Sequence, residues 1–239
     1  MKEITSLQHP LVKYWSKLVQ DSRFRKDEAR ALLEGKNCLP NLPIERLIVT
    51  DASLIPKGVQ AKELYLVSDA IIKKITQVQS PEGIIAELAL PKMTPLTGAK
   101  RVVVADRIQD PGNLGTLIRS SLAFGWEGLF LLPGSVDPFN DKALRAAKGA
   151  TFSLPLFSGT WEELALLELP VVVADTRGEA PSAFSPSSMA LVLGNEAQGA
   201  AVPNSIPYRK VTLAMHGATE SLNVAIAGSI LLYLFQETR

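Results

Sequence analysis

The chain has 239 residues, of which 46% are hydrophobic and 21% charged, and its formal net charge at pH 7 is +1. This composition indicates a globular protein with one large or two small domains, and the near-neutral charge alone gives no sign of a nucleic-acid partner. A single cysteine, Cys38, excludes a disulfide framework and a cysteine-based metal site.

The sequence shows no sign of targeting to or across a membrane. Its first ten residues, MKEITSLQHP, lack the apolar segment of a signal peptide. The longest apolar run, residues 224–235, is shorter than the ~20 residues that a membrane-spanning helix needs, and it contains Gly228 and Ser229. We therefore expect a cytoplasmic protein with no membrane partner.

The first 92 residues predict a small α/β domain. Apolar residues recur at helical spacing early in residues 5–33, which predicts a helix there. Short apolar runs and one capped, periodic stretch predict further elements: strands at 46–50, 63–67 and 83–90, and a helix at 68–78. Two prolines and a glycine in PKMTPLTGAK (91–100) indicate a linker. The expected organisation is a domain of residues 1–92, a linker at 93–99 and a second domain of residues 100–239.

Charge is distributed unevenly between the two parts. Lys and Arg outnumber Asp and Glu by 14 to 11 in residues 1–96, whereas they number 11 against 13 in residues 97–239. Much of the excess lies in the first 36 residues, which include RFRKDEAR at 23–30. Such a stretch is either the solvated face of a helix or a basic surface that contacts RNA.

The second part alternates between strand and helix patterns. The expected strands are short leucine-rich and β-branched runs without polar alternation, typical of parallel strands that are covered on both faces. They lie at 101–106, 128–132, 152–157, 169–175 and 190–194. The expected helices lie at 114–124, 140–149, 160–167 and 220–236. This alternation predicts an α/β fold with a mainly parallel sheet and helices on both faces.

The stretch DPGNLGTLIRSSLAFG (110–125) follows the first of these strands. Ligands bind at the carboxyl ends of strands in open α/β sheets. Pro111 and two glycines indicate a tight turn, and Asn113 is expected to cap a helix that begins at Leu114. Arg119 stands among apolar residues in a helix that we expect to be buried. An unpaired buried arginine is costly, so Arg119 either has a structural partner or is held for an anion such as phosphate.

Two more polar, glycine-containing stretches follow expected strands. LVLGNEAQGAAVP (191–203) leaves one strand, and VTLAMHGATESLNVAIAGSILLYLF (211–235) leaves another and opens the last helix. Thr219 is the expected N-cap of that helix, and Glu220 suits its positive end. The first turn of the helix leaves N–H groups free for a ligand. The chain carries none of the GxGxxG, P-loop, HExxH or GxSxG motifs.

Together these stretches resemble the motifs of the SpoU (TrmH) family of RNA 2′-O-ribose methyltransferases, within the SPOUT superfamily. The resemblance covers residues 101–235, in the order DPGNLGTLIRSSLAFG, LVLGNEAQG and LAMHGATESLNVAIAGSI. Polar positions by which the family is recognised fall on Asn113, Arg119, Glu196, Ser221 and Asn223. A weaker resemblance, carried by ALLEGKNCL (31–39) and SPEGIIAEL (80–88), likens the first domain to the ribosomal-protein-like RNA-binding domain that precedes many members.

The resemblance implies a trefoil-knotted second domain that binds S-adenosylmethionine in a bent form inside the knot. Knots are rare exceptions to the rules of chain topology, and composition alone could not predict one. By position, the cofactor contacts of the family fall on Gly194, Leu213 and Leu222.

The resemblance also implies roles for the five polar residues, which would form the catalytic site. Arg119 would hold an RNA phosphate and stabilise negative charge at the 2′-oxygen, because arginine keeps its own proton too firmly to act as a base. Asn113 and Asn223 would position the ribose or the backbone of the turns. Glu196 would hold Arg119 or Asn113 by a charged hydrogen bond. Ser221 would orient the phosphate or Asn223.

Methyl transfer from a sulfonium needs well-placed groups rather than a metal, and a chain with two histidines and one cysteine suits that chemistry. The expected substrate is large-subunit (23S) ribosomal RNA, with transfer RNA as the alternative. Two other classes are an RNA-binding protein with a relic cofactor fold and a nucleotide-dependent small-molecule enzyme. The intact polar positions argue against the first, and the missing GxGxxG against the second. A homodimer is expected because the helix at 222–235 is apolar on nearly every side.

Overall fold

The computed structural model describes residues 1–39, 43–184, 187–216 and 221–236. Its contacts divide the chain into two compact units. The first consists of Met1–Lys92 together with Phe139–Phe152, and the second of Met93–Pro138 together with the residues from Ser153 onward. The contacts thus group residues 139–152 with the first unit, whereas the sequence suggested a single second domain of residues 100–239. The domain boundaries stay a prediction.

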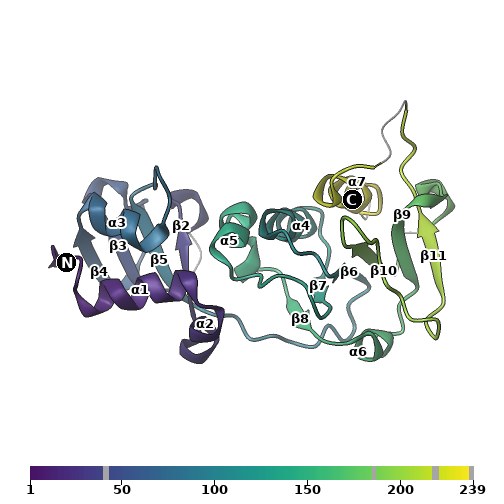
Figure 1. The fold of residues 1–239 in the computed structure, drawn as a ribbon, viewed down its shortest axis with the longest axis horizontal. Coiled ribbons are helices and arrows are strands. Elements are labelled where there is room, and N and C mark those ends of the chain that lie inside the picture. The colour runs from purple at the N-terminus through teal and green to yellow at the C-terminus, as the bar shows by residue number, and fades with distance from the viewer. Residues whose placement is uncertain (40–42, 185–186, 217–220, 237–239) are drawn as a thin grey trace. The chain divides into compact units, whose positions relative to one another are not determined.

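A mixed five-stranded sheet forms the centre of the first unit, with the strand order β1-β4-β3-β5-β2. β1, β4 and β3 are parallel, and β5 pairs antiparallel with β3 and β2. The strands are β1 (Lys2–Ile4), β2 (Arg30–Glu34), β3 (Ile44–Val49), β4 (Ala61–Val67) and β5 (Ile84–Ala89). The helices are α1 (Pro10–Gln20), α2 (Ser22–Glu28), α3 (Asp69–Thr76) and α5 (Asp141–Ala147). The helices α1 and α3 lie side by side against this sheet (Figure 1).

The single helix expected at 5–33 is wrong, because three elements occupy this stretch. Asp21 ends α1 and caps α2, and its side chain accepts hydrogen bonds from the N–H groups of Arg23 and Phe24. Ala29 then adopts a left-handed conformation (φ 50°), and Arg30–Glu34 becomes strand β2, which pairs with β5. The run RALLE is too short for a stable helix of its own, and sheet pairing satisfies its backbone.

The second unit is built on a six-stranded sheet in which every pair of neighbours is parallel, with the order β11-β9-β10-β6-β7-β8. The strands are β6 (Arg101–Asp106), β7 (Gly128–Leu131), β8 (Leu156–Ser158), β9 (Val171–Glu179), β10 (Met189–Gly194) and β11 (Tyr208–Val211). The helices are α4 (Pro111–Ala123), α6 (Trp161–Ala165) and α7 (Val224–Leu234). The predicted α/β class with a mainly parallel sheet is therefore confirmed.

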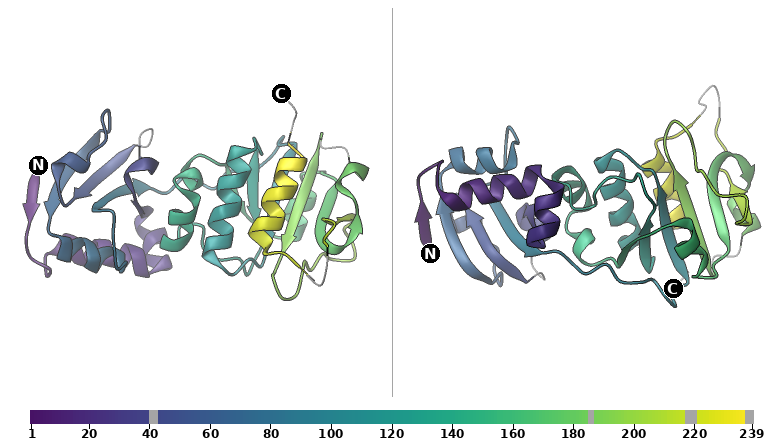
Figure 2. Two further views of the ribbon diagram at one scale, coloured as in Figure 1. Left: turned by 90° about the horizontal axis from the view of Figure 1, so that it is seen from above. Right: turned by 60° about the horizontal axis from the view of Figure 1, so that its bottom comes forward.

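Helices cover both faces of this sheet. α4 and α7 lie together on one face, and α6 lies on the other (Figure 1, Figure 2). Every residue of β6 and β10 is buried, which explains why these strands show no polar alternation in the sequence. The sheet order changes direction at β6, because β7 lies on one side of it and β10 on the other. In such sheets the carboxyl ends of the strands beside this reversal form the ligand crevice.

The ends of several elements differ from the expected ones. The strand expected at 152–157 forms at Leu156–Ser158, because residues 150–152 make a short 3₁₀ turn. The helix expected from residue 220 begins at Val224, after the N-cap Asn223. Thr219 and Glu220, the expected cap and first-turn acid, lie outside the described residues. The implied knot stays a prediction.

Candidate functional site

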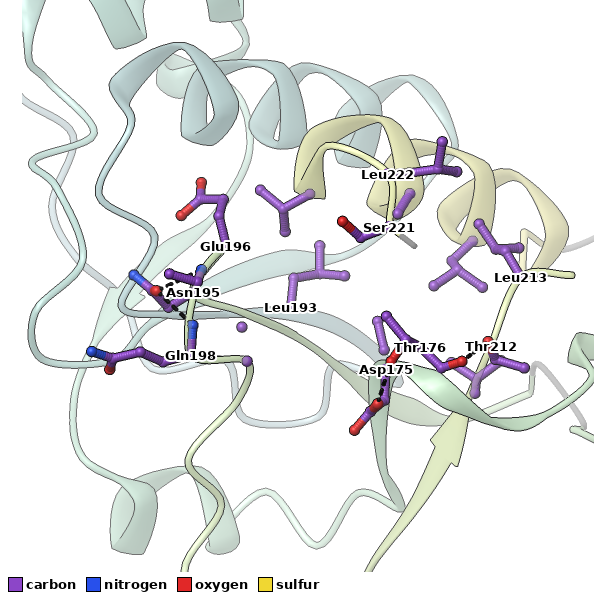
Figure 3. A pocket seen from close by; sticks show the side chains of 18 of the residues that line it. Asp175, Thr176, Leu193, Asn195, Glu196, Gln198, Thr212, Leu213, Ser221 and Leu222 are labelled. Carbon is purple, nitrogen blue, oxygen red and sulfur yellow. Dashed lines mark hydrogen bonds between the residues drawn. The ribbon is translucent and has the colours of Figure 1, made fainter. Parts of the chain in front are cut away.

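A pocket of about 400 Å³ opens at the carboxyl ends of β10 and β11, beside the middle of β9 and the start of α7 (Figure 3). Its volume lies in the range typical of sites for small molecules and cofactors. Four segments of the chain line it: Ala174, Asp175 and Thr176; Leu193, Gly194, Asn195, Glu196, Ala197, Gln198 and Gly199; Val211, Thr212, Leu213 and Met215; Ser221, Leu222, Val224, Ala227 and Leu231.

The three residues expected to contact a cofactor, Gly194, Leu213 and Leu222, all line this one pocket. They come from segments that are separated in sequence and meet only in the fold. Gly194 ends β10, opposite Asp106 at the end of β6. A Cβ atom at position 194 would lie 2.2 Å from the backbone nitrogen of Ala200, so the chain cannot take this path with any side chain there.

The pocket combines apolar walls with carboxylates. Asp175 and Glu196 are its only charged residues among those that the structure describes, and no Lys, Arg or His lines it. A hydrogen bond from Lys210, with Nζ 2.7 Å from Oδ2, lowers the pKa of Asp175 and keeps this carboxylate ionised. Since Lys210 compensates the charge of Asp175, Glu196 is the carboxylate in this lining that favours positive charge on a ligand, beside the apolar walls.

Beside the pocket, a chain of hydrogen bonds joins the three sequence motifs. Asn113 donates from Nδ2 to Oε1 of Glu196 (2.8 Å), and Asn223 donates from Nδ2 to Oδ1 of Asn113 (3.0 Å). The Oδ1 of Asn223 accepts from the N–H of Ala225 at 2.9 Å and so caps α7. A carboxylate can only accept, so Glu196 determines the orientation of both amide groups in turn.

The expectation that Asn113 caps the helix is wrong. Asp110 is the N-cap of α4, and its Oδ1 accepts from the N–H of Asn113 at 2.7 Å. Pro111 occupies the first helical position, where its missing N–H costs nothing. The helix therefore begins three residues earlier than expected, which leaves the side chain of Asn113 free to reach Glu196 and Asn223.

Arg119 is exposed, so the expectation that it is buried is wrong, although one side of α4 is buried as expected. Leu117 and Ile118 are buried, but Arg119 lies on the other side of α4, near Leu122, which is 40% exposed. Within the described part of the chain, its guanidinium has no hydrogen bond or ion pair, and Glu196 bonds to Asn113 instead. Arg119 does not line the pocket. Its free guanidinium can bind an anion that arrives from outside.

The structure thus brings Glu196, Asn113 and Asn223 into contact, and places Glu196 and Ser221 on the pocket wall. Sequence reasoning missed the pocket residues Asp175, Thr176 and Thr212. A signal for Asp175 was available, because the apolar run LPVVVAD ends in an aspartate, just as RVVVAD does, although β9 continues past it to Glu179.

Among the described residues, no group of three or more His, Cys, Asp or Glu side chains could hold a metal ion. In the same residues, no helix has both the length and the apolar character needed to cross a membrane.

Comparison with known proteins gives consistent matches. Residues 100–233 match the model of the SpoU rRNA Methylase family. The chain is 32% identical to the 23S rRNA (guanosine(2553)-2′-O)-methyltransferase RlmP of Bacillus subtilis, over 98% of each chain. It is 30% identical to an uncharacterized tRNA/rRNA methyltransferase of Synechocystis, over 96% of this chain and 92% of the relative. The AdoMet-bound rRNA methyltransferase of Sinorhizobium meliloti has a similar structure, with a TM-score of 0.82 and 26% identity over 98% of this chain and 97% of that one.

Proposed function

Because the chain belongs to the SpoU rRNA methylase family, we propose that it transfers a methyl group from S-adenosylmethionine to a ribose 2′-hydroxyl of large-subunit ribosomal RNA. The observation that carries this proposal is that the three sequence motifs meet at the carboxyl edge of one sheet. The expected cofactor residues share a pocket there, and Glu196, Asn113 and Asn223 are bonded beside it. The similarity to RlmP, over nearly the full length of both chains, supports 23S RNA as the substrate.

The pocket fits S-adenosylmethionine by its chemistry. When bound, this cofactor supplies a methyl group on a positively charged sulfonium. Leu193, Leu213 and Val224 offer apolar surface to the ligand. Glu196 offers negative charge, whereas the charge of Asp175 is already paired with Lys210. The close backbone turn at Gly194 lets main-chain groups approach the ligand.

Arg119 then serves the RNA rather than the cofactor. The 2′-hydroxyl must lose its proton to solvent water as its oxygen attacks, and a guanidinium nearby stabilises the negative charge that develops. Arginine holds its own proton too firmly to act as the base, so Arg119 binds the adjacent phosphate and lowers the cost of deprotonation. Asn113 and Asn223, whose amide groups are oriented by the hydrogen bond to Glu196, position the ribose.

The second unit also carries an apolar surface that suits a second copy of the chain. One side of α7 packs inward through Ala225, Gly228, Leu231 and Leu232, but the other side is exposed. Five side chains there and on α4 are 39–56% exposed: Leu122, Ile226, Ile230, Tyr233 and Leu234. Contiguous apolar surface of this kind supports the proposal of a homodimer through α7.

RNA binding by the first unit and a cytoplasmic location stay predictions. The basic stretch at 23–30 supports the former, because Arg23 and Lys26 are exposed on α2 and free to meet phosphate.

The test is transfer of a labelled methyl group to purified, unmodified 23S RNA, 16S RNA and transfer RNA in parallel. We expect label in 23S RNA. Label in transfer RNA alone would favour the alternative substrate. Tight RNA binding without any S-adenosylmethionine binding would favour an RNA-binding protein with a relic cofactor fold.

A further inference from the structure

Arg107 has an unusual backbone conformation next to the cofactor pocket. It directly follows β6 and has a φ of 56°, in the left-handed region that few residues other than glycine adopt. Its guanidinium reaches across to the loop after β10. Nη1 donates to Oε1 of Gln198 (2.9 Å), and Nη2 donates to the carbonyl oxygen of Gly199 (2.9 Å). Both Gln198 and Gly199 line the pocket.

Asp106 also bonds to the loop after β10. Asp106 is 3% exposed. Its carboxylate accepts hydrogen bonds from the N–H of Ala201 at 2.6 Å and from Nε of Arg107 at 3.1 Å. The Nδ2 of Asn195 donates to the carbonyl oxygen of Arg107 at 3.0 Å, and Oδ1 of Asn195 accepts from the N–H of Ala197. The loop is therefore fastened at its start, its tip and its end to the turn after β6.

This loop has little room to move without changing the pocket. The backbone of Ala200 already lies so close to Gly194 that no Cβ atom fits between them. A shift of residues 198–200 would therefore alter the space beside Gly194, where the motif resemblance places a cofactor contact. The planar guanidinium presents five donors in a fixed geometry, and here it bonds a carboxylate, an amide oxygen and a carbonyl oxygen at once.

We propose that Arg107 is a positioning residue for cofactor binding, which holds the loop 195–201 in the conformation that binds S-adenosylmethionine. This inference rests on the proposed function. The left-handed backbone at Arg107 has an energetic cost, and its hydrogen bonds to the loop offset that cost.

Four variants test it: Arg107→Ala, Arg107→Gly, Arg107→Lys and the control Arg209→Ala. Arg209 is also ion-paired, with Nη2 on Oε2 of Glu179, but it lies on β11 away from the loop. Titration calorimetry gives the dissociation constant for S-adenosylmethionine, and thermal melting gives stability. If losing the guanidinium leaves the loop in the binding conformation about a tenth of the time, the dissociation constant rises about tenfold.

We expect the dissociation constant for S-adenosylmethionine to rise about tenfold in both Arg107→Ala and Arg107→Gly. The glycine variant should melt at the higher temperature of the two, because glycine accepts the left-handed backbone. The lysine variant should recover part of the affinity, and Arg209→Ala should keep all of it. In methyl transfer, KM for the cofactor should rise while kcat at saturating cofactor and KM for RNA stay the same.

Two results would overturn the inference. Arg107→Gly could recover wild-type affinity along with stability, which would give Arg107 a purely structural role, or all three Arg107 variants could bind as tightly as the wild type. Failure of the wild-type protein to bind S-adenosylmethionine would instead contradict the proposed function together with this inference.

Discussion

Asn113 connects the three motifs through a single amide group. It donates to Glu196 and accepts from Asn223, so it links the start of α4 to the loop after β10 and to the cap of α7. The sequence predicted Asn113 as a site residue but also as a helix cap, which is Asp110 instead. Both residue types are good caps, and Pro111 between them was the signal for the earlier start, since proline favours the first helical position.

Arg119 shows what a one-dimensional pattern leaves open. Its sequence neighbours are apolar, and this led to the expectation of a buried arginine. The apolar residues Leu114, Leu117 and Ile118 face inward, and Arg119 falls on the outer side of the same helix. Which side of a helix faces solvent depends on the sheet beneath it, and a lone cation among small and apolar residues does not determine that side.

Replacing Arg119 should separate catalysis from stability. Since its side chain is exposed and has no partner among the described residues, Arg119→Ala should change the free energy of unfolding by less than about 0.5 kcal/mol. Cofactor affinity should stay the same, while the rate of methyl transfer should fall by about 10²–10³. Arg119→Lys should recover only part of the rate, because an ammonium lacks the two-pronged contact with phosphate.

Thermal melting and transfer from labelled cofactor on both variants provide the measurement. A large fall in melting temperature, with transfer lost only in proportion to the unfolded fraction, would show that Arg119 stabilises the fold and has no role in the reaction.

At the level of elements, the strands of the second unit were predictable and several helix boundaries were not. β6 and β10 lie within one residue of their expected ends, because buried parallel strands appear as uninterrupted apolar runs. Strand β2 was missed, because its pairing with β5, more than 50 residues later in the chain, decides its conformation. Local propensity cannot report a partner that is distant in sequence.

The close approach of the backbone after β10 predicts that no side chain is tolerated at Gly194. Gly194→Ala would place a methyl group on the backbone of Ala200, so the loop 195–201 must move. Cofactor affinity should then fall at least tenfold, as measured by titration calorimetry. Gly58→Ala is the matched control, because Gly58 has a positive φ of 83° with open space around it. That variant should lose stability from backbone strain but bind the cofactor normally, whereas equal losses of affinity in both variants would contradict the close-approach argument.

The exposed side of α7 makes a prediction about assembly. Ile226→Lys with Ile230→Lys places two charges on a face where these residues are 54% and 39% exposed. If this face joins two copies, the double variant should sediment as a monomer at micromolar concentration, where the wild type sediments as a dimer. Leu166→Lys is the control, since Leu166 is 79% exposed outside this face, at the end of α6. A wild-type monomer under the same conditions would contradict the proposal.

For the molecule as a whole, the sequence predicted an α/β protein with a linker near residues 93–99. The contacts show one grouping of residues that the sequence pattern does not indicate. Residues 139–152 group with the first unit, where α5 contacts β2. In the sequence this segment is simply one more helix between two strands of the second sheet. Its partner cannot be recognised, because a short amphipathic helix can pack on any apolar surface of suitable size.

This grouping affects how RNA binding by the first unit should be tested. A truncated chain that begins near residue 97 would leave the buried side chains of α5 without their partner, so charge reversal in the full chain is preferable. Arg23→Glu with Lys26→Glu should weaken RNA binding and flatten its salt dependence by about 0.7–0.9 in the logarithmic slope for each lost phosphate contact. Cofactor affinity should not change.

Lys57→Glu with Lys62→Glu makes the same change in charge on other exposed residues of the first unit. If both pairs weaken binding equally, net charge rather than a local contact with α2 is responsible. If neither pair changes affinity or slope, the basic stretch at 23–30 is only a solvated helix face.

The central claim is that this chain methylates the 2′-oxygen of ribose in large-subunit ribosomal RNA. The most direct measurement is digestion of unmodified 23S RNA to nucleosides after incubation with the protein and labelled S-adenosylmethionine, followed by mass spectrometry of the labelled product. We predict that the label appears in one 2′-O-methylated nucleoside and that Arg119→Ala, although it still binds the cofactor, yields at least a hundredfold less in the same time. Label on a base instead of the ribose, or no labelled nucleoside from a protein that binds both cofactor and RNA, would contradict the claim.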